Sequence, residues 1–285
     1  MGYVDDAFGK LKETLEITPT EQELAKTRHV LVRDHIRETW DLDDDFLTGS
    51  YSRHTKTKKL KDVDIFIVID PNGAQSSLAK GSPTDALKKL HDVLAKRWTD
   101  LTLDDHVVTI NYSGEEVASY EVAPVFARSA GGYLMPNAGE WMATDPTVHK
   151  AMVTAKNKEC DEKFVPLVKM LKGINRHFDE PICPAFLLEV MALELVLPPC
   201  ARFRDEIRFF LASAVDQITN DWPDPAGLGD DVNASVSLAQ RRTLVDVLRG
   251  WLTTAEDALL LEQEGKERAA VERWRELFGW RMPRP

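Results

Sequence analysis

The sequence GSYSRHT at residues 49–55, followed by DVDIFIVI at residues 62–69, decides the fold of this chain. The apolar, β-branched run after Asp64 predicts a buried strand. Side chains two positions apart on a strand point to the same face, so Asp62 and Asp64 project together from its start. Adjacent carboxylates repel each other, and a divalent cation such as Mg²⁺ or Mn²⁺ removes that repulsion. An isolated Asp-x-Asp pattern is equally compatible with two acids at a solvated strand end.

The turn before this strand carries groups that suit a phosphate. Gly49 gives the backbone freedom, and Ser50 offers a hydroxyl and an amide to phosphate oxygens. Arg53 lies in the same segment and is a further candidate nucleotide contact. Positive charge between the turn and the carboxylates comes from Lys56, Lys58, Lys59 and Lys61. The alternative is an ordinary polar loop, and we expect most of these four lysines to be solvated.

A third carboxylate is needed if two metal ions are to be held. Residues 106–112 and 117–126 read as two strands joined by a turn. Glu121 stands in an otherwise apolar part of the second strand, where an acid is costly unless it is paired or metal-bound. Glu121 is therefore the candidate third ligand. The alternative is an edge-strand glutamate that faces water, which Pro124 favours because proline is found at sheet edges.

These motifs resemble the DNA polymerase β-like nucleotidyltransferases. Gly-Ser, then Asp-x-Asp on a strand, then a third acid before x-x-Pro is the pattern of that superfamily. More closely, the chain is similar to the CD-NTases, the cGAS/DncV-like nucleotidyltransferases of bacterial CBASS antiphage systems. The similarity continues through segments that resemble the family's Tyr-Leu-Ile-Pro and Thr-Asp-Pro motifs and the first two helices of its second lobe: residues 132–136, 144–146, 166–172 and 186–189.

The resemblance implies an α+β fold. A polymerase β-like sheet-and-helix lobe would occupy residues 1–144 and an all-helical lobe residues 145–285, with the active site in the cleft between them. Asp62, Asp64 and Glu121 would bind two Mg²⁺ ions, with Mn²⁺ as a possible substitute.

The second lobe would supply further nucleotide contacts. Lys169 and Lys172 lie three residues apart and share a face of the helix expected to start near residue 163. The resemblance favours Lys169 as a triphosphate contact. Tyr133 is a candidate contact of the base. The alternative for the two lysines is a surface position with the charged ends in water.

The resemblance further implies an enzyme that joins NTPs into a cyclic di- or trinucleotide second messenger, releasing pyrophosphate, in antiphage signalling. The product would activate a downstream effector, and a regulatory partner protein fits the family. One alternative is a linear nucleotidyltransferase acting on RNA, a protein or a small molecule. Another is a catalytically silent nucleotide-binding protein, favoured by two departures from the family pattern: Glu121 replaces the usual Asp, and His54 replaces a frequent Gly.

Composition limits the kinds of partner and the cellular location that we expect for this chain. The chain has 285 residues and a formal net charge of −11, so general nucleic-acid binding, which depends on phosphate contacts, is not expected. We find no signal-peptide pattern and no apolar stretch of membrane-spanning length, which predicts a cytoplasmic protein without a membrane anchor. The three cysteines, Cys160, Cys183 and Cys200, are widely spaced, and we expect reduced cytosolic thiols.

Apolar periodicity predicts the remaining elements. Residues 41–45 read as an acidic loop, and about twenty residues after the last predicted strand read as a further loop. The other predicted strands are 46–49 and 63–69. The predicted helices are 3–15, 19–40, 84–98, 146–159, 161–177, 184–196, 202–219, 235–261 and 265–279.

Overall fold

The computed structural model describes residues 2–177 and 182–285, and the chain divides into two compact units. One unit is Ile17–Lys150, and the other combines Met1–Glu16 with Ala151–Pro285. The first helix, α1 (Tyr3–Leu15), therefore belongs with the helical unit rather than with the sheet. The reason is its buried face: Phe8 packs edge-on against Trp274, with ring centroids 5.2 Å apart.

The unit Ile17–Lys150 is built on a sheet of mixed direction. Strands β2 and β5 are parallel, and the other paired strands are antiparallel. The order along the sheet is β1-β2-β5-β4-β3, with β6 beside β5 and β7 beside β6. The strands are β1 (Leu42–Leu47), β2 (Asp62–Ile69), β3 (Leu101–Leu103), β4 (Val108–Asn111), β5 (Ser119–Ala127), β6 (Tyr133–Asn137) and β7 (Glu140–Thr144).

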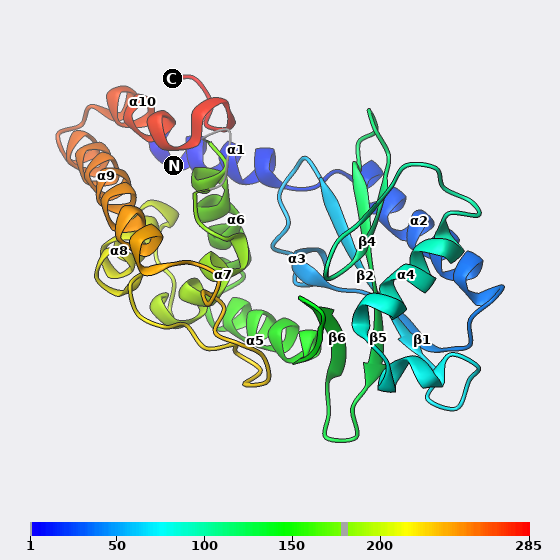
Figure 1. The fold of residues 1–285 in the computed structure, drawn as a ribbon. Helices are drawn as coiled ribbons and strands as arrows, with labels where there is room; N and C mark the ends of the chain where they lie inside the picture. The colour runs from blue at the N-terminus through cyan, green and yellow to red at the C-terminus, as the bar shows by residue number, and fades with distance from the viewer. Residues whose placement is uncertain (1, 178–181) are drawn as a thin grey trace. The chain divides into compact units, whose positions relative to one another are not determined.

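Two helices, α2 (Pro19–Arg37) and α4 (Pro83–Leu94), cover one face of this sheet (Figure 1). A capping box begins α2, with the Thr18 side chain accepting from the Glu21 amide at 3.1 Å. The odd positions of β2, such as Ile65 and Ile67, are fully buried under the helices, and each such side chain contributes about 1.5–3 kcal/mol. The even positions, which include Asp62 and Asp64, therefore point to the opposite face.

The short helices of this unit are α3 (Gly49–Ser52) and the 3₁₀ turn η1 (Ser76–Lys80). Two sequence predictions are wrong here. The acidic segment is mostly strand β1, because an edge strand pairs on one side only and leaves Asp43 and Asp44 exposed. The predicted long loop contains the β6–β7 hairpin, whose turn places Ala138 and Gly139 at positive φ.

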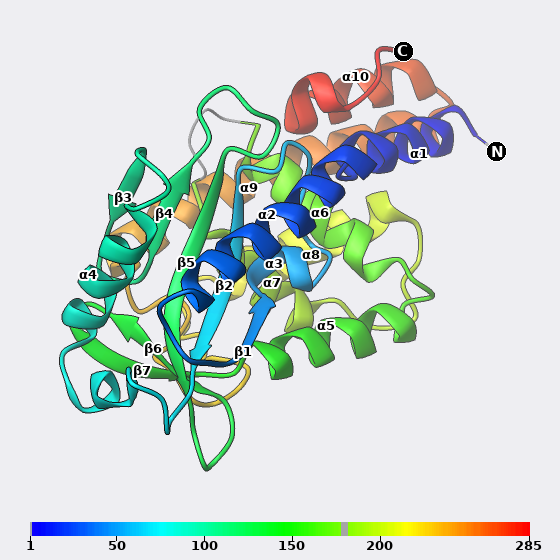
Figure 2. The ribbon, with the colours of Figure 1, turned by 90° about the vertical axis from the view of Figure 1, so that its right-hand side faces the viewer.

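The helical unit is formed by α1 and by the helices from Ala151 onward, where the unit begins within α5. Helices α8, α9 and α10 pack in succession, and α1 lies beside α10 (Figure 2). Large apolar side chains such as Trp274, Phe164 and Phe210 fill its core. The helices are α5 (Pro146–Glu159), α6 (Phe164–Asn175), α7 (Ala185–Leu195), α8 (Phe203–Gln217), α9 (Leu238–Gln263) and α10 (Glu267–Phe278), followed by the 3₁₀ turn η2 (Gly279–Arg281).

The prediction that all three cysteines are free thiols is wrong. Cys160, after α5, and Cys200, before α8, form a disulfide with their Cα atoms 4.8 Å apart. They are 40 residues apart in sequence, so spacing along the chain carried no sign of the pairing. Cys183 is free and buried, and burial raises the pKa of its thiol to about 12.

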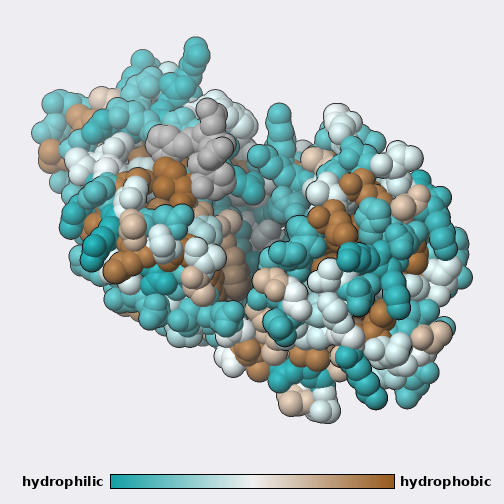
Figure 3. Space-filling model, viewed as in Figure 1, coloured by the Kyte–Doolittle hydropathy of each residue, from teal (hydrophilic) through white to brown (hydrophobic). Residues whose placement is uncertain are grey.

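The face drawn in Figure 3 is mainly hydrophilic on both units, with hydrophobic residues in scattered groups. Within the described ranges, no helix is both long enough and apolar enough to cross a membrane.

Candidate active site

The pairing of β2 with β5 assembles the predicted carboxylates. In the parallel register Asp64 lies opposite Glu121, and Asp62 lies opposite Ser119 on the same face. The alternative reading of Glu121 as an edge-strand residue is wrong, because β5 runs between β2 and β4. Pro124 is tolerated inside the sheet, since the β4 pairing ends opposite Val122 and leaves that side of β5 open.

Asp64 and Glu121 share a hydrogen bond, and both carboxyl groups are only partly exposed. Burial raises the pKa of Glu121 to about 7, and the nearby charges of Asp64 and Asp62 add to the rise. Burial likewise raises the pKa of Asp64. The pair therefore holds a proton under conditions in which isolated carboxylates are ionised. A set of acids that is costly to ionise together is suited to a cation.

Gly49 brings the phosphate-type turn against the carboxylates. It has a φ of +60°, a conformation that other residues rarely adopt, and a Cβ atom there would overlap the Asp64 side chain. The amide of Thr48 donates to the Asp64 carbonyl at 2.8 Å, which ties the turn to β2. Ser50 follows in α3 and is partly buried. The structure thus brings the predicted Gly-Ser turn and Asp-x-Asp motif together.

Most of the basic segment after the turn is solvated, as expected. Lys58, Lys59 and Lys61 are exposed, as predicted, but Lys56 is only 4% exposed and its ammonium forms an ion pair with Asp62. Arg53 is also buried and lowers the pKa of Asp64 against the effect of burial. The sequence analysis named Lys56 with the other three lysines but did not single it out, since four lysines in six positions offer no periodicity that separates the buried one.

Tyr133 lies on the same face of the sheet as the carboxylates. Its ring contacts Phe46 and Phe66, with centroids 5.4 and 6.0 Å away. Phe66 follows Asp64 by two positions on β2, which fixes the shared face. The aromatic cluster of Phe46, Phe66 and Tyr133 thus continues the surface that begins at the carboxylates.

The two predicted lysines of the helical unit are both buried and paired. Lys169 contacts Glu16 at the end of α1, with Nζ 2.5 Å from Oε2. Lys172 contacts Glu189 on α7 at the same Nζ–Oε distance of 2.5 Å, and both side chains are at most 4% exposed. The alternative of two surface lysines is therefore wrong. Each cation joins two helices of its unit.

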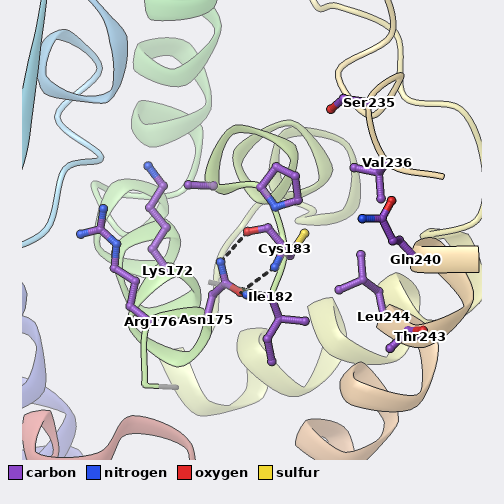
Figure 4. A pocket seen from close by; sticks show the side chains of 12 residues that line it. Lys172, Asn175, Arg176, Ile182, Cys183, Ser235, Val236, Gln240, Thr243 and Leu244 are labelled. Carbon is purple, nitrogen blue, oxygen red and sulfur yellow. Dashed lines mark hydrogen bonds between the residues drawn. The ribbon is translucent and has the colours of Figure 1, made fainter. Parts of the chain in front are cut away.

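Lys172 also lines a pocket of about 520 Å³ in the helical unit. Figure 4 shows Lys172 and Arg176 on one side and Gln240, Thr243 and Leu244, from the start of α9, on the other. Asn175, also in the lining, accepts from the Ile182 and Cys183 amides and donates to the Cys183 carbonyl. These bonds hold Ile182 and Cys183 against the end of α6 in the pocket wall.

The chemistry of the donor set fits a divalent ion, although the side chains are not yet arranged as a cage. Among the residues that the structure describes, no three acidic, histidine or cysteine side chains form a ready metal site. Asp62 is held by Lys56, and Asp64 shares its hydrogen bond with Glu121. All three carboxylates nonetheless project from adjacent strands on one face, and carboxylate oxygens are the ligands that Mg²⁺ and Mn²⁺ prefer.

An Asp-x-Asp strand beside a strand with a third acid, preceded by a Gly-Ser turn, defines the polymerase β-like nucleotidyltransferases. Solved structures agree with this fold. Bradyrhizobium diazoefficiens CdnG, described as a CD-NTase in complex with GTP, has a TM-score of 0.76 at 15% identity, covering 99% of this chain and 96% of that one. Escherichia coli MS115-1 CdnC, in a complex with HORMA-deltaN, has a TM-score of 0.74 at 13% identity, covering 98% of both chains.

Residues 1–157 match the Second Messenger Oligonucleotide or Dinucleotide Synthetase domain, and the chain belongs to this family. A curated relative, the cyclic AMP-AMP-AMP synthase of Acinetobacter sp. (strain ATCC 27244 / 9458), is 25% identical over 260 residues. The match covers 84% of this chain and 72% of the relative. The protein is therefore a nucleotidyltransferase of the CD-NTase type, an enzyme that joins NTPs into a cyclic second messenger. This family depends on divalent metal ions.

Proposed function

We propose that Asp62, Asp64 and Glu121 are the catalytic carboxylates of this synthase and hold two Mg²⁺ ions, which Mn²⁺ can replace. The observation that carries the proposal is the register of β2 and β5, which sets Asp64 opposite Glu121 with Asp62 on the same face. Bound divalent ions would supply activation of a ribose hydroxyl and stabilisation of the leaving pyrophosphate. The carboxylates would hold these ions at the start of β2 and at the adjacent part of β5.

The Gly-Ser turn would hold the phosphates of the donor nucleotide. Gly49 lies against Asp64, so a phosphate at the Ser50 amide and hydroxyl would lie beside the carboxylates. Arg53, buried near Asp64, adds positive charge at this point. The Tyr133 ring, on the same face, would contact a base.

Lys169 and Lys172 are proposed as triphosphate contacts on weaker support. Both ammonium groups already bind carboxylates of Glu16 and Glu189. Lys172 lines the pocket of the helical unit, which supports access of an anion to that lysine. A lysine that holds a triphosphate would exchange its carboxylate partner for phosphate oxygens.

The test is turnover of radiolabelled ATP, GTP, CTP and UTP with Mg²⁺ and separately with Mn²⁺, followed by phosphatase and chromatography. A phosphatase-resistant product is the expected result. Leaving out one NTP at a time identifies its bases, and ATP is the first to test because a relative is named as a cyclic AMP-AMP-AMP synthase. A phosphatase-sensitive product would indicate a linear transferase, and nucleotide binding without pyrophosphate release would indicate a silent binder.

Two double variants test the assignment of the catalytic carboxylates. Asp62→Asn with Asp64→Asn should abolish pyrophosphate release while the protein stays folded. Asp230→Asn with Asp231→Asn makes the same charge change on an exposed loop of the helical unit and should leave turnover unchanged. Wild-type release of pyrophosphate by the first double variant would refute the assignment.

A regulatory partner protein is a further part of the proposal. It is supported by the E. coli relative, whose structure is a complex of CdnC with HORMA-deltaN. We expect the cyclic product to act on a separate effector. The partner is tested by measuring NTP turnover of the purified chain alone and again after proteins encoded next to its gene are added.

A further inference from the structure

The further inference concerns Lys56, the buried lysine of the segment between α3 and β2. Its side chain is 4% exposed, whereas that of its partner Asp62 is 33% exposed. A lysine is rarely this buried unless it is paired. The ammonium therefore reaches the carboxylates from the protein side, and Asp62 forms the solvent side of the pair.

The backbone around Lys56 is fixed at both ends. The Thr55 amide donates to the Ser50 carbonyl at 3.0 Å, which attaches the segment to α3. Further along, the Leu60 amide donates to the Glu21 carboxylate of α2 at 2.7 Å. Thr55 and Thr57, on either side of Lys56, are also buried. The fold thus directs this lysine at the site, unlike its exposed neighbours.

The charge of Lys56 acts on all three catalytic carboxylates. It pairs directly with Asp62, and it opposes the rise in pKa that burial produces at Asp64 and at Glu121. The Lys56 ammonium on Asp62 therefore offsets part of the negative charge of these carboxylates when no metal is bound. A divalent ion bound to Asp62 would lie beside the Lys56 ammonium and repel it, so the two cations compete for this carboxylate.

We propose that Lys56 is a built-in counter-ion of the catalytic carboxylates, which holds Asp62 until a divalent ion and an NTP enter together and which then transfers its ammonium to the triphosphate. Divalent ions alone displace Lys56 at an electrostatic cost, because they add positive charge to a site that already holds Lys56 and Arg53. The triphosphate removes that cost by giving the ammonium new oxygen partners. The site therefore fills with metal mainly in the presence of nucleotide. This inference rests on the proposed metal-binding role of the carboxylates.

The first experiment measures Mn²⁺ binding to the full chain by electron paramagnetic resonance, with and without a non-hydrolysable ATP analogue. Lys56→Met keeps the length of the side chain and removes the charge. It should raise nucleotide-free Mn²⁺ affinity by about tenfold or more, a difference of about 1.4 kcal/mol per decade, and should weaken binding of the analogue. Lys61→Met, an exposed lysine next to Asp62, should change neither value by more than about twofold.

The outcomes separate this inference from the proposed function. Unchanged or weaker Mn²⁺ binding by a folded Lys56→Met variant would overturn the role of Lys56. The Asp62→Asn, Asp64→Asn variant serves as the reference for the metal site itself. If that variant bound Mn²⁺ as the wild type does, the proposed function would fail instead.

A second measurement uses the wild-type protein and so does not depend on folding of a variant. Acetylation of lysines, read by mass spectrometry, should leave Lys56 protected in EDTA. Saturating Mn²⁺ alone should increase its labelling several-fold, and addition of the ATP analogue should protect it again, while Lys61 is labelled equally throughout. If saturating Mn²⁺ left the extent of Lys56 acetylation unchanged, displacement of Lys56 by the metal would be contradicted.

Discussion

Glu121 lies directly opposite Asp64 on the neighbouring parallel strand, and the two carboxyl groups share a hydrogen bond. Burial and the facing charges raise the pKa of Glu121 from 4.5 to about 7. A carboxyl group with a raised pKa in the folded state binds a proton more tightly there than in the unfolded chain. Protonation therefore stabilises the folded, metal-free protein.

The first prediction is a loss of stability as pH rises. The contribution of Glu121 is fully present below pH 4.5 and is lost as pH rises through about 7. In EDTA, the free energy of unfolding of the wild type minus that of Glu121→Gln should decrease as the pH rises from 4.5 to about 7. Saturating Mg²⁺ should reverse the trend, because metal binding requires the ionised carboxylates. Urea unfolding of both proteins across this range is the measurement, and parallel curves in EDTA would contradict the assigned proton.

Gly49 carries the second prediction, because it combines a positive φ with contact to Asp64. Gly49→Ala should lower the free energy of unfolding by about 2 kcal/mol or more, since backbone strain adds to overlap with the Asp64 side chain. It should also reduce turnover by about tenfold or more, as the displaced carboxylate loses its position. Chemical unfolding and NTP turnover are the two measurements.

Gly114→Ala is the matched control for Gly49. Gly114 has a φ of +83°, but a Cβ atom there would have open space around it. Only the strain of about 1–2 kcal/mol should appear, with turnover unchanged. Equal effects of the two substitutions on turnover would show that contact with Asp64 has no special role.

The sequence was sufficient to predict the part of the fold that depends on local pattern. The β-branched run of β2 and the amphipathic helices of the second unit were both found, since one buried face imposes a regular spacing. The start of α2 is also set locally, because the side chains of Thr18 and Glu21 bind backbone amides of the first turn. The pairing of Asp64 with Glu121 was expected from the family pattern, and the strand register confirms that the two lie together.

Features set by distant contacts were not predictable in this way. Lys56 looks like its three exposed neighbours in the sequence, and it differs from them in the folded chain by its ion pair with Asp62. Helix α1 joins the helical unit because Phe8 meets Trp274, which is 266 positions later in the chain (274 − 8). The strands of the β6–β7 hairpin show only weak alternation of apolar and polar residues. The glycines at 131 and 132 therefore favoured the prediction of a loop in this segment.

The buried pair of Lys172 and Glu189 gives a third prediction. Lys172→Met leaves the Glu189 carboxylate, 2% exposed, without its ammonium partner, and should lower the free energy of unfolding by about 3–5 kcal/mol. Lys172→Met with Glu189→Leu should recover most of that loss, because replacing a whole buried pair by apolar groups is often neutral. Urea unfolding of the three proteins is the measurement.

Lys169→Met is the comparison for Lys172. Its partner Glu16 has a side chain that is 43% exposed and stays hydrated after the change, so the loss should be about 1 kcal/mol or less. The two variants also test the nucleotide contacts, since a triphosphate contact should raise the KM for NTP in a variant that remains stable. A normal KM in stable Lys169→Met would limit that lysine to joining α1 and α6.

His54 gives the last prediction, because it has a φ of +60°, a conformation that residues with a side chain rarely adopt. The left-handed conformation costs a non-glycine residue about 1–2 kcal/mol, and part of this is offset by the greater freedom of glycine in the unfolded chain. His54→Gly should therefore raise the free energy of unfolding by about 0.5–1 kcal/mol. His91→Gly, a change of the same residue types within α4, should lower it by about 0.3–0.5 kcal/mol. Thermal unfolding of both variants under identical conditions should show opposite signs, and a loss of stability in His54→Gly would mean that the imidazole makes contacts that outweigh its strained backbone.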